Sequence, residues 1–344
     1  MKLYIEHYTE IHKWKTMAFV TREWILRENH KNIIDDLKFL IRKWINVILY
    51  HNINPNTWNN IFISENIESK IPLAQIERIP SDIDIYEYVL SLKKNIDKLI
   101  ILERQCLIWE DWEKINTIST KKLFVEIEEN DINWLWIWNV NFRKSLLNIC
   151  KSVENWDIHR VHIIPWWRYH SIKHELFSLE WVWTLIWNNF GKPEILETNE
   201  LDVPIIKGIL ESNKGNKYLK PRTSEYILEN IFNFRIAYLD WIPVGCVEIK
   251  QENERTIELW WLAVVHSFLS LRIWISLIEY VENYAINNWF DIISLTNNEK
   301  LQSIYNKIWL KKDKTGIYKT RENKSPWVSL FYIEHSRLIE NSKL

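Results

Sequence analysis

The sequence predicts an α/β protein with two domains of different architecture. In the first half, apolar strand-like runs alternate with amphipathic helical segments, beginning with a strand at 15–24, a helix at 28–43 and a strand at 45–50. This β-α-β order is typical of a parallel sheet. After residue 194 the order changes to two helical segments, a hairpin, and then a strand, a helix and a further strand. We therefore expect a parallel-sheet α/β domain over residues 1–187 and an α+β domain over 194–344.

The composition excludes several classes of function. A net charge of −1 gives no basic surface for nucleic acid or anionic membranes. The three scattered cysteines favour a reducing compartment. The first thirteen residues are too polar for a signal peptide, and no apolar run approaches the length of a membrane span. We expect a cytoplasmic protein with no nucleic-acid or membrane partner.

Tryptophan and glycine occur in inverted proportions. The chain has 22 Trp and 5 Gly, whereas glycine normally makes up roughly 7% of residues. Several tryptophans stand where glycine is favoured: Trp44 and Trp289 separate a helix from a strand, Trp156 lies in a turn, and Trp241 follows Asp240 between two strand-like runs. A Cβ in the left-handed region costs roughly 1–2 kcal/mol.

We hypothesise that most of these tryptophans are glycines in the living cell. Some bacterial lineages read the codon UGA as glycine, and a UGA read as tryptophan would produce this pattern. The excess of Ile, Asn and Lys fits an AT-rich genome, in which UGA would be common. The alternative is a protein that is truly rich in tryptophan, although aromatic side chains do not favour turns.

The remaining elements of the first half follow from periodicity. A polar, turn-rich stretch covers 51–82. The elements expected after it are a helix at 84–96, a strand at 98–103, a hairpin-like turn at 107–114, a capped segment and helix at 117–129, a helix at 139–154, a strand at 159–164 and a helix at 169–178. 

Four histidines lie close together in the sequence, at His159, His162, His170 and His174. A metal site would need three or four converging ligands. His159 and His162 are three apart on a strand, so their side chains point to opposite faces. We therefore expect surface or packing histidines and no metal.

In the second half, helices are expected at 200–213 and 223–233, and a strand hairpin at 234–249. An apolar strand then runs through 257–265, and a helix follows whose apolar residues repeat at helical spacing. A strand at 292–296, a helix at 299–308 and a terminal strand near 328–335 complete the chain.

The first half resembles an amino-acid kinase domain. The segments WKTMAFVTREW and KWINVILY resemble its start, and KLIILERQCLIWEDWEK with the residues from NVNFRKSLL to WVWTLI resembles its C-terminal half. With glycine at the tryptophans, this part looks like the kinase-like domain of the N-acetylglutamate synthase family. The resemblance implies a regulatory, oligomer-forming domain and a homo-oligomer. Thr21 and Arg22 replace the glycine pair that cradles phosphate, so we expect no kinase activity.

The second half resembles the GNAT superfamily of acetyltransferases. The stretch KYLKPRTSEYILENIFNFRIAYLDWIPVGCVEI is similar to the acetyltransferase domain of the N-acetylglutamate synthase family. The resemblance implies an amino-acid N-acetyltransferase, with acetyl-CoA as co-substrate, no metal, and the α-amino group of L-glutamate as acceptor, the first step toward arginine. It also implies arginine as an allosteric ligand.

Acetyl transfer needs a base for the amine and an acid for the departing thiolate. Glu258 lies on a strand six residues before Val264, the spacing at which the superfamily often places a general base. The alternative is a solvated edge carboxylate. Tyr305 in SIYNKIWL matches the pattern F-Y-x-x-x-G-F, whose tyrosine protonates the thiolate. The alternative for Tyr305 is a core aromatic.

The resemblance places coenzyme A along the strand and the loop that follows it. The residues implied as its contacts are Leu262, Ala263, Val264, Val265, Ser270, Arg272, Ile273, Trp274 and Ile275. The superfamily pattern Q/R-x-x-G-x-G/A reads L-S-L-R-I-W at 269–274, with Trp274 where a glycine is expected. Leu269 and Arg272 remain departures after correction, although Arg272 offers a direct phosphate contact.

For the acceptor, Arg222 in YLKPRTSEY matches a family arginine that holds a substrate carboxylate. The alternative is a surface arginine after a proline turn. Ser336 matches the serine of the family's Y-x-R-R-S-K, but the two arginines are Glu334 and His335 here. Two other functions therefore stay open: acetylation of a different amine, and a non-catalytic arginine-sensing protein.

Overall fold

A computed structural model gives the structure of the chain, and it divides into two compact units, Met1–Phe190 and Gly191–Leu344. The structure describes residues 5–58, 74–92, 96–108, 114–129, 140–178, 184–188, 192–213, 222–239, 242–296, 302, 305, 310–313 and 329–341. Each unit is built around its own seven-stranded sheet. Within these ranges, no helix combines the length and the apolar character needed to cross a lipid bilayer.

The first unit has a mixed sheet with the strand order β3-β2-β1-β4-β6-β7-β5. Its strands are β1 (Thr16–Thr21), β2 (Asn46–His51), β3 (Ala74–Arg78), β4 (Lys98–Glu103), β5 (Thr117–Ser119), β6 (Arg160–Pro165) and β7 (Thr184–Trp187). The strands β3, β2, β1, β4 and β6 are parallel to one another. β7 runs antiparallel to β6, and β5 runs parallel to β7. The predicted parallel sheet therefore has an antiparallel edge, which short apolar runs could not reveal because they carry no signal of strand direction.

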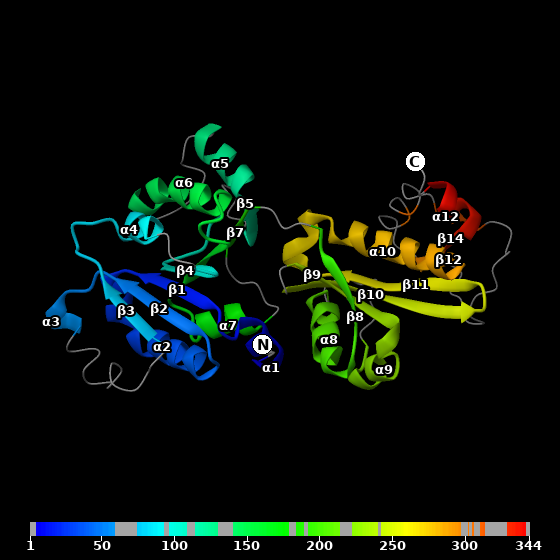
Figure 1. Cartoon of the computed structure of the whole chain (residues 1–344), viewed down its shortest axis with the longest axis horizontal. Coiled ribbons are helices and arrows are strands. Elements are labelled where there is room, and N and C mark those ends of the chain that lie inside the picture. The colour runs from blue at the N-terminus through cyan, green and yellow to red at the C-terminus, as the bar shows by residue number, and fades with distance from the viewer. Residues whose placement is uncertain are drawn as a thin grey trace. The chain divides into compact units, whose positions relative to one another are not determined.

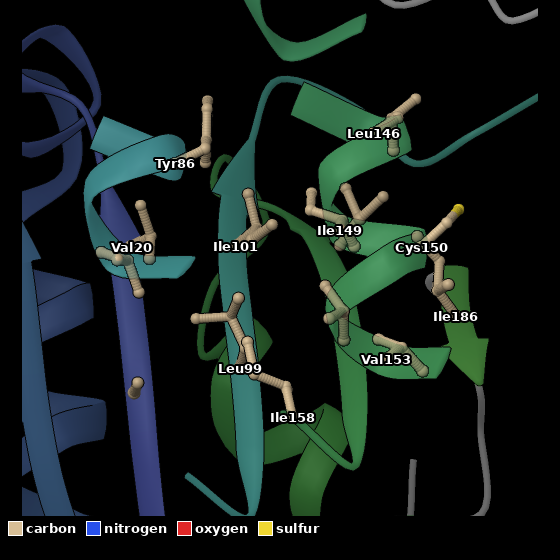
Figure 2. Close-up of a cluster of buried hydrophobic side chains, with 14 of the residues drawn as sticks. Val20, Tyr86, Leu99, Ile101, Leu146, Ile149, Cys150, Val153, Ile158 and Ile186 are labelled. Atoms are coloured by element: carbon tan, nitrogen blue, oxygen red, sulfur yellow. The ribbon is translucent and has the colours of Figure 1, made fainter. Parts of the chain in front are cut away.

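Helices cover both faces of this sheet (Figure 1). The helices are α1 (Ile5–His12), α2 (Glu23–Arg42), α3 (Pro55–Trp58), α4 (Ile85–Ser91), α5 (Thr120–Glu129), α6 (Val140–Glu154) and α7 (Ser171–Phe177). In Figure 1, α4, α5 and α6 lie on one side of the strands, and α1, α2 and α7 lie on the other. Figure 2 shows the core beneath α4 and α6, where Val20 and Ile101 of the strands face Tyr86 and Ile149 of the helices. Burial of these side chains holds the α4–α6 layer on the sheet.

The second unit has the strand order β13-β14-β12-β11-β10-β9-β8. Its strands are β8 (Glu194–Glu197), β9 (Phe234–Leu239), β10 (Ile242–Asn253), β11 (Thr256–Val264), β12 (Asp291–Thr296), β13 (Lys311–Lys312) and β14 (Ser329–Ile333). Neighbouring strands are antiparallel except β11 and β12, which are parallel. Helices α8 (Val203–Ser212) and α9 (Ser224–Glu229) lie on one side of the sheet, and α10 (Ile273–Asn288) and α12 (His335–Asn341) on the other (Figure 1).

Tryptophans occupy most of the left-handed positions in the described part of the chain. Seven non-glycine residues there have a positive φ, and five of them are tryptophans. The five are Trp14, Trp44, Trp156, Trp261 and Trp289. Four of these indoles are also largely exposed, Trp261 being the buried one. A left-handed backbone favours glycine, so this distribution supports the hypothesis of glycine at these positions.

Three of these tryptophans stand just beyond a helix, in the arrangement that ends a helix with glycine. The N–H of Trp44 donates to the carbonyl of Ile41 over 3.0 Å, and the next N–H donates to Leu40 over 3.3 Å. Trp156 and the residue after it make the same pair of bonds at the end of α6. At the end of α10, the N–H of Phe290, which follows Trp289, donates to the carbonyl of Ala285, five residues earlier. These are the two bonds of the Schellman motif, whose left-handed residue is usually glycine.

We predict that Trp44→Gly, Trp156→Gly and Trp289→Gly each raise the free energy of unfolding by about 1 kcal/mol, because each removes a Cβ from the left-handed region. Denaturant unfolding of the single variants measures this. Trp167→Gly is the matched control, since Trp167 is exposed but has no positive φ, and it should give no gain.

The same hypothesis is tested without mutagenesis. Peptides from the protein of the native cell should carry glycine at the three positions. UGG codons at these sites, or a loss of stability in all three variants, would contradict it.

Candidate active site

The site is organised by a place where two parallel strands of the second sheet separate. The pairing of β11 with β12 runs from Thr256–Asp291 to Glu258–Ile293 and stops there, although β11 continues to Val264. On its other edge β11 has a β-bulge opposite β10, and the left-handed Trp261 lies within it. A bulge twists and bends its strand. The far end of β11 therefore has one backbone edge that β12 does not cover.

Tyr305 lies beside this separation and is held by a serine of β12. Ser294 Oγ donates to the carbonyl of Leu259 over 3.1 Å and lies 3.0 Å from the Tyr305 hydroxyl. The hydroxyl of Ser294 is also the donor toward Tyr305, and its single proton serves one of the two oxygens at a time. Leu259 is the first residue of β11 beyond the paired segment. Sequence reasoning missed Ser294, because a single serine in an apolar strand gives no signal.

The phenol of Tyr305 keeps its proton. Its side chain is 3% exposed. Burial raises the pKa of Tyr305, the bond to Ser294 opposes that rise, and the charge of Glu258 adds to it. Tyr305 is therefore a neutral acid at physiological pH, and it lies within electrostatic range of Glu258.

Glu258 is a buried carboxylate in the middle of the sheet. It is 1% exposed, with Lys250 of β10 opposite it on one side and Ile293 of β12 on the other. The alternative of a solvated edge carboxylate does not fit this position. Its role as a general base stays a prediction, which requires the substrate amine within hydrogen-bond reach of this carboxylate.

Arg222 packs against the same strand two and three residues beyond Glu258. Its guanidinium carbon lies 4.4 Å from the ring centre of Tyr226, 4.9 Å from that of Trp260 and 4.4 Å from that of Trp261. Among the described residues, its buried Nε has no hydrogen-bond partner. Arg222 is thus not a free surface arginine, and an uncompensated donor on a cation favours an anionic ligand.

Two residues that sequence reasoning did not identify, Tyr226 and Glu248, hold the aromatic ring against which Arg222 packs. The hydroxyl of Tyr226 donates to Glu248 Oε1 over 2.7 Å, and Glu248 is fully buried on β10 opposite Trp260. This bond fixes the ring on which Arg222 lies. Tyr226 sits four residues after Arg222 in YLKPRTSEY, which is the signal that could have drawn attention to it.

The loop after β11 differs in detail from the expected one. Residues His266–Leu271 form a 3₁₀ helix, and Arg272 is the left-handed residue that precedes α10, with φ of 55°. Trp274 lies inside the first turn of α10, so the position that most favours glycine is 272. The guanidinium of Arg272 is exposed at the N-terminal end of this 16-residue helix, where anions are stabilised.

Hydrogen bonds at the end of β11 decide which of its backbone N–H groups can face a ligand. The N–H of Val265 donates to Val244 over 2.8 Å and is therefore occupied on the β10 side. Successive N–H groups of a strand point to opposite edges, so the N–H of Val264 faces the uncovered edge. Asn213 of the α8 C-terminus donates to the carbonyl of Val264 over 3.0 Å and fixes this strand end.

Ser336 is not brought to Arg222. It is exposed on α12, which lies on the α10 side of the sheet, whereas Arg222 precedes α9 on the opposite side (Figure 1). The predicted substrate residues therefore do not form one cluster in this unit. Arg222 with Tyr226 and Glu248 lies against β11 just beyond Glu258, and Ser336 does not.

Comparison with solved structures gives the fold. N-acetylglutamate synthase from Neisseria gonorrhoeae, solved with coenzyme A and L-arginine, matches 96% of this chain and 98% of its own, at 13% identity and a TM-score of 0.52. The same enzyme solved with coenzyme A and N-acetyl-glutamate matches 96% and 99%, at 14% identity and a TM-score of 0.44. A GNAT-family acetyltransferase from Staphylococcus aureus Mu50 matches 41% and 97%, at 20% identity and a TM-score of 0.35.

No family model matches the sequence, and no curated protein matches it. The first of these likenesses extends over nearly the whole of both chains. The chain therefore has the fold of N-acetylglutamate synthase, an α/β fold built on two sheets, which confirms the predicted fold class.

We predict that Ser294 and Tyr305 are energetically coupled. Ser294→Ala and Tyr305→Phe should each lower the free energy of unfolding, and the double variant should lose less than the sum, with a coupling of about 0.5–1.5 kcal/mol for one buried hydrogen bond. Denaturant unfolding of the four proteins measures this. Ser294→Ala combined with Tyr226→Phe is the control and should be additive; strict additivity in the first pair would contradict the bond.

Proposed function

We propose that this chain is an N-acetyltransferase that moves the acetyl group of acetyl-CoA to the α-amino group of an acidic amino acid, L-glutamate being the acceptor that the resemblance implies. The observation that carries the proposal is the separation of β11 from β12 beyond Glu258, where Ser294 links Leu259 to Tyr305. The fold that the chain shares with N-acetylglutamate synthase supports it.

The reaction follows from the positions of the two groups. The uncovered edge of β11, with the N–H of Val264, would bind the pantetheine arm as an added strand would bind. The substrate nitrogen attacks the thioester carbonyl, the C–N bond forms, and Glu258 accepts the proton that the nitrogen loses. The C–S bond then breaks, and Tyr305 donates its proton to the thiolate. Ser294 orients the phenol for this step.

The loop between β11 and α10 has only some of the residues that a pyrophosphate-binding loop needs. The helix end at α10 and the exposed guanidinium of Arg272 suit an anion. Leu269 contributes no polar group where the superfamily has Arg or Gln. With glycine at position 274, the backbone of the first helical turn would be open to the phosphates, because no indole would stand over it.

The acceptor is bound by its carboxylate at Arg222. Trp260 and Trp261 lie over the guanidinium. As glycines they would uncover it, leaving Tyr226 beneath it and a space for a carboxylate at its face. The acceptor amine would then lie toward Glu258, because Arg222 packs on Trp260 and Trp261, two and three residues beyond Glu258 on β11.

A second acceptor class has one observation in its favour. Glu334 and His335 replace the two arginines of the family motif, and Ser336 lies away from Arg222. An acceptor with a single carboxylate needs only Arg222, so a neutral amino acid or another amine is the alternative. Homo-oligomer formation and inhibition by L-arginine belong to the same proposal and concern the first unit.

Turnover identifies the acceptor. The glycine-corrected chain should acetylate L-glutamate in a panel of amino acids and amines supplied with acetyl-CoA. Turnover only with another amine would support the alternative, and no turnover with any amine would support a non-catalytic sensor.

We predict that Glu258→Gln and Tyr305→Phe each lower kcat by about 10²–10⁴-fold with little change in KM, the usual range for loss of a general base or acid. Steady-state kinetics on the glycine-corrected chain measures this. Glu254→Gln, which removes an exposed carboxylate of the β10–β11 hairpin, is the matched control and should leave kcat unchanged.

Because the pKa of Tyr305 is raised, the acid stays protonated, and the rate should not fall between pH 7 and about 9.

We predict that the chain with Trp260, Trp261 and Trp274 does not bind coenzyme A, and that the three Trp→Gly changes together restore binding. The indole of Trp274 would otherwise cover the first amides of α10. Isothermal titration calorimetry with coenzyme A measures this. Trp289→Gly, at the far end of α10, is the control and should restore nothing; tight binding by the tryptophan chain would overturn this account.

A further inference from the structure

Two cations of the second unit lie against the same indole, that of Trp260. The guanidinium carbon of Arg222 lies 4.9 Å from its ring centre, and the ammonium nitrogen of Lys250 lies 5.3 Å from it. Arg222 comes from the chain before α9, whereas Lys250 belongs to β10. Acetyl transfer as proposed uses Arg222 for the acceptor's carboxylate and gives Lys250 no part. Position 260 therefore has a second, unassigned cation beside it.

The register of β10 and β11 places Lys250 on the face of the sheet that carries Glu258. These two residues are opposite each other, and the next pair on that face is Glu248 with Trp260. Directly opposed residues of an antiparallel pair have their side chains on one face, and residues two apart on a strand share that face. Lys250, Glu258 and Trp260 therefore project from the same face, and Arg222 packs against it.

The ammonium of Lys250 is open to exchange with a ligand. It donates to Glu252 Oε1 over 3.0 Å, and the two side chains are 34% and 20% exposed. An ion pair in contact with water contributes little to stability, so the carboxylate of a ligand can compete with Glu252. An ammonium also has three N–H donors, more than one carboxylate oxygen uses. Coenzyme A is a poor candidate for this ligand, because the uncovered edge of β11 lies beyond Glu258, toward Val264.

We propose that Lys250 binds the side-chain carboxylate of an acidic acceptor whose α-carboxylate lies on Arg222. The inference rests on the proposed function and on glycine at position 260, which would leave the space of an indole beside both cations. The acceptor would be held by its two carboxylates, with its amine toward Glu258. Lys250 is then the residue that determines specificity for an acidic side chain.

The pair of cations ranks the acceptors by charge. An acidic amino acid satisfies both cations, whereas L-glutamine, of the same length, gives Lys250 only a neutral partner. A basic amine is repelled by both cations. Glu334 and His335 replace the two arginines of the family motif. Lys250 would supply the second positive charge from a different strand.

The test is calorimetric titration of the glycine-corrected chain with L-glutamate and L-glutamine in the presence of coenzyme A. L-glutamate should bind at least about tenfold more tightly, because L-glutamine keeps the α-carboxylate and exchanges one charge-assisted contact for a neutral one. Equal affinity for the two, or no binding of L-glutamate, would overturn the inference. The titration needs no turnover, so a preference for L-glutamate without acetylation would count against acetyl transfer and still support the assignment of Lys250.

Four variants locate the preference. Lys250→Met should lower the affinity for L-glutamate about tenfold or more and leave that for L-glutamine unchanged, whereas Lys250→Arg should keep the preference. Arg222→Gln should weaken both ligands by a similar factor, because both carry the α-carboxylate. Lys192→Met, which removes an exposed lysine paired with Glu279, is the matched control and should change neither.

Two results of these variants would overturn the inference. One is a preference for L-glutamate that survives in Lys250→Met. The other is an equal loss of both ligands in that variant, which is the result expected if Lys250 only supported the charge of Glu258.

Discussion

The candidate site depends on the fact that β11 cannot pair with both of its neighbours along its full length. β10 follows it to its end, but only across a bulge, and the parallel pairing with β12 stops at Glu258. The separation does two things at once. It leaves a backbone edge that a substrate can pair with, and it places Glu258 and Tyr305 at the point where the strands part. Ser294 holds the opening by linking Leu259 of one strand to Tyr305.

The bulge also explains why the tryptophans matter for function as well as for stability. Trp261 is the left-handed residue within it and is buried, whereas the other left-handed tryptophans are exposed at helix ends. At a helix end an indole costs backbone strain and little else. At Trp261 the same strain is accompanied by an indole against Arg222, with its Nε1 buried and lacking a hydrogen-bond partner among the described residues. A glycine would remove the strain, the orphaned donor and the cover over Arg222 together.

Much of this could be predicted from the sequence, and the limits have physical causes. Apolar periodicity gave strands and helices such as β4 and α6, because it is a local property of side chains. The direction of β7 was not predictable, because strand pairing is decided by distant residues. Glu258 and Tyr305 were selected by the resemblance to a superfamily pattern, and their catalytic roles stay a prediction. Ser294, Tyr226 and Glu248 do not, because their roles exist only where strands and helices meet. Trp274 was identified as the loop anomaly, yet the left-handed backbone is at Arg272, since the 3₁₀ turn of His266–Leu271 sets where the helix begins.

Arg22 occupies a position at which amino-acid kinases have a phosphate-binding glycine, and it changes which ligand charge this position suits. A glycine pair after the first strand lets phosphate oxygens reach the backbone amides, which any long side chain obstructs. Arg22 reaches instead toward the ends of β1 and β4, where Tyr86 and Glu103 hold its Nε. Tyr86 in turn donates to Glu103, so the guanidinium is fixed from two sides. A cavity beside Arg22 is also lined by Asp82, Asp84 and Glu87, so its described lining carries one cation and three carboxylates. That lining is unsuited to the polyanion that a kinase would bind.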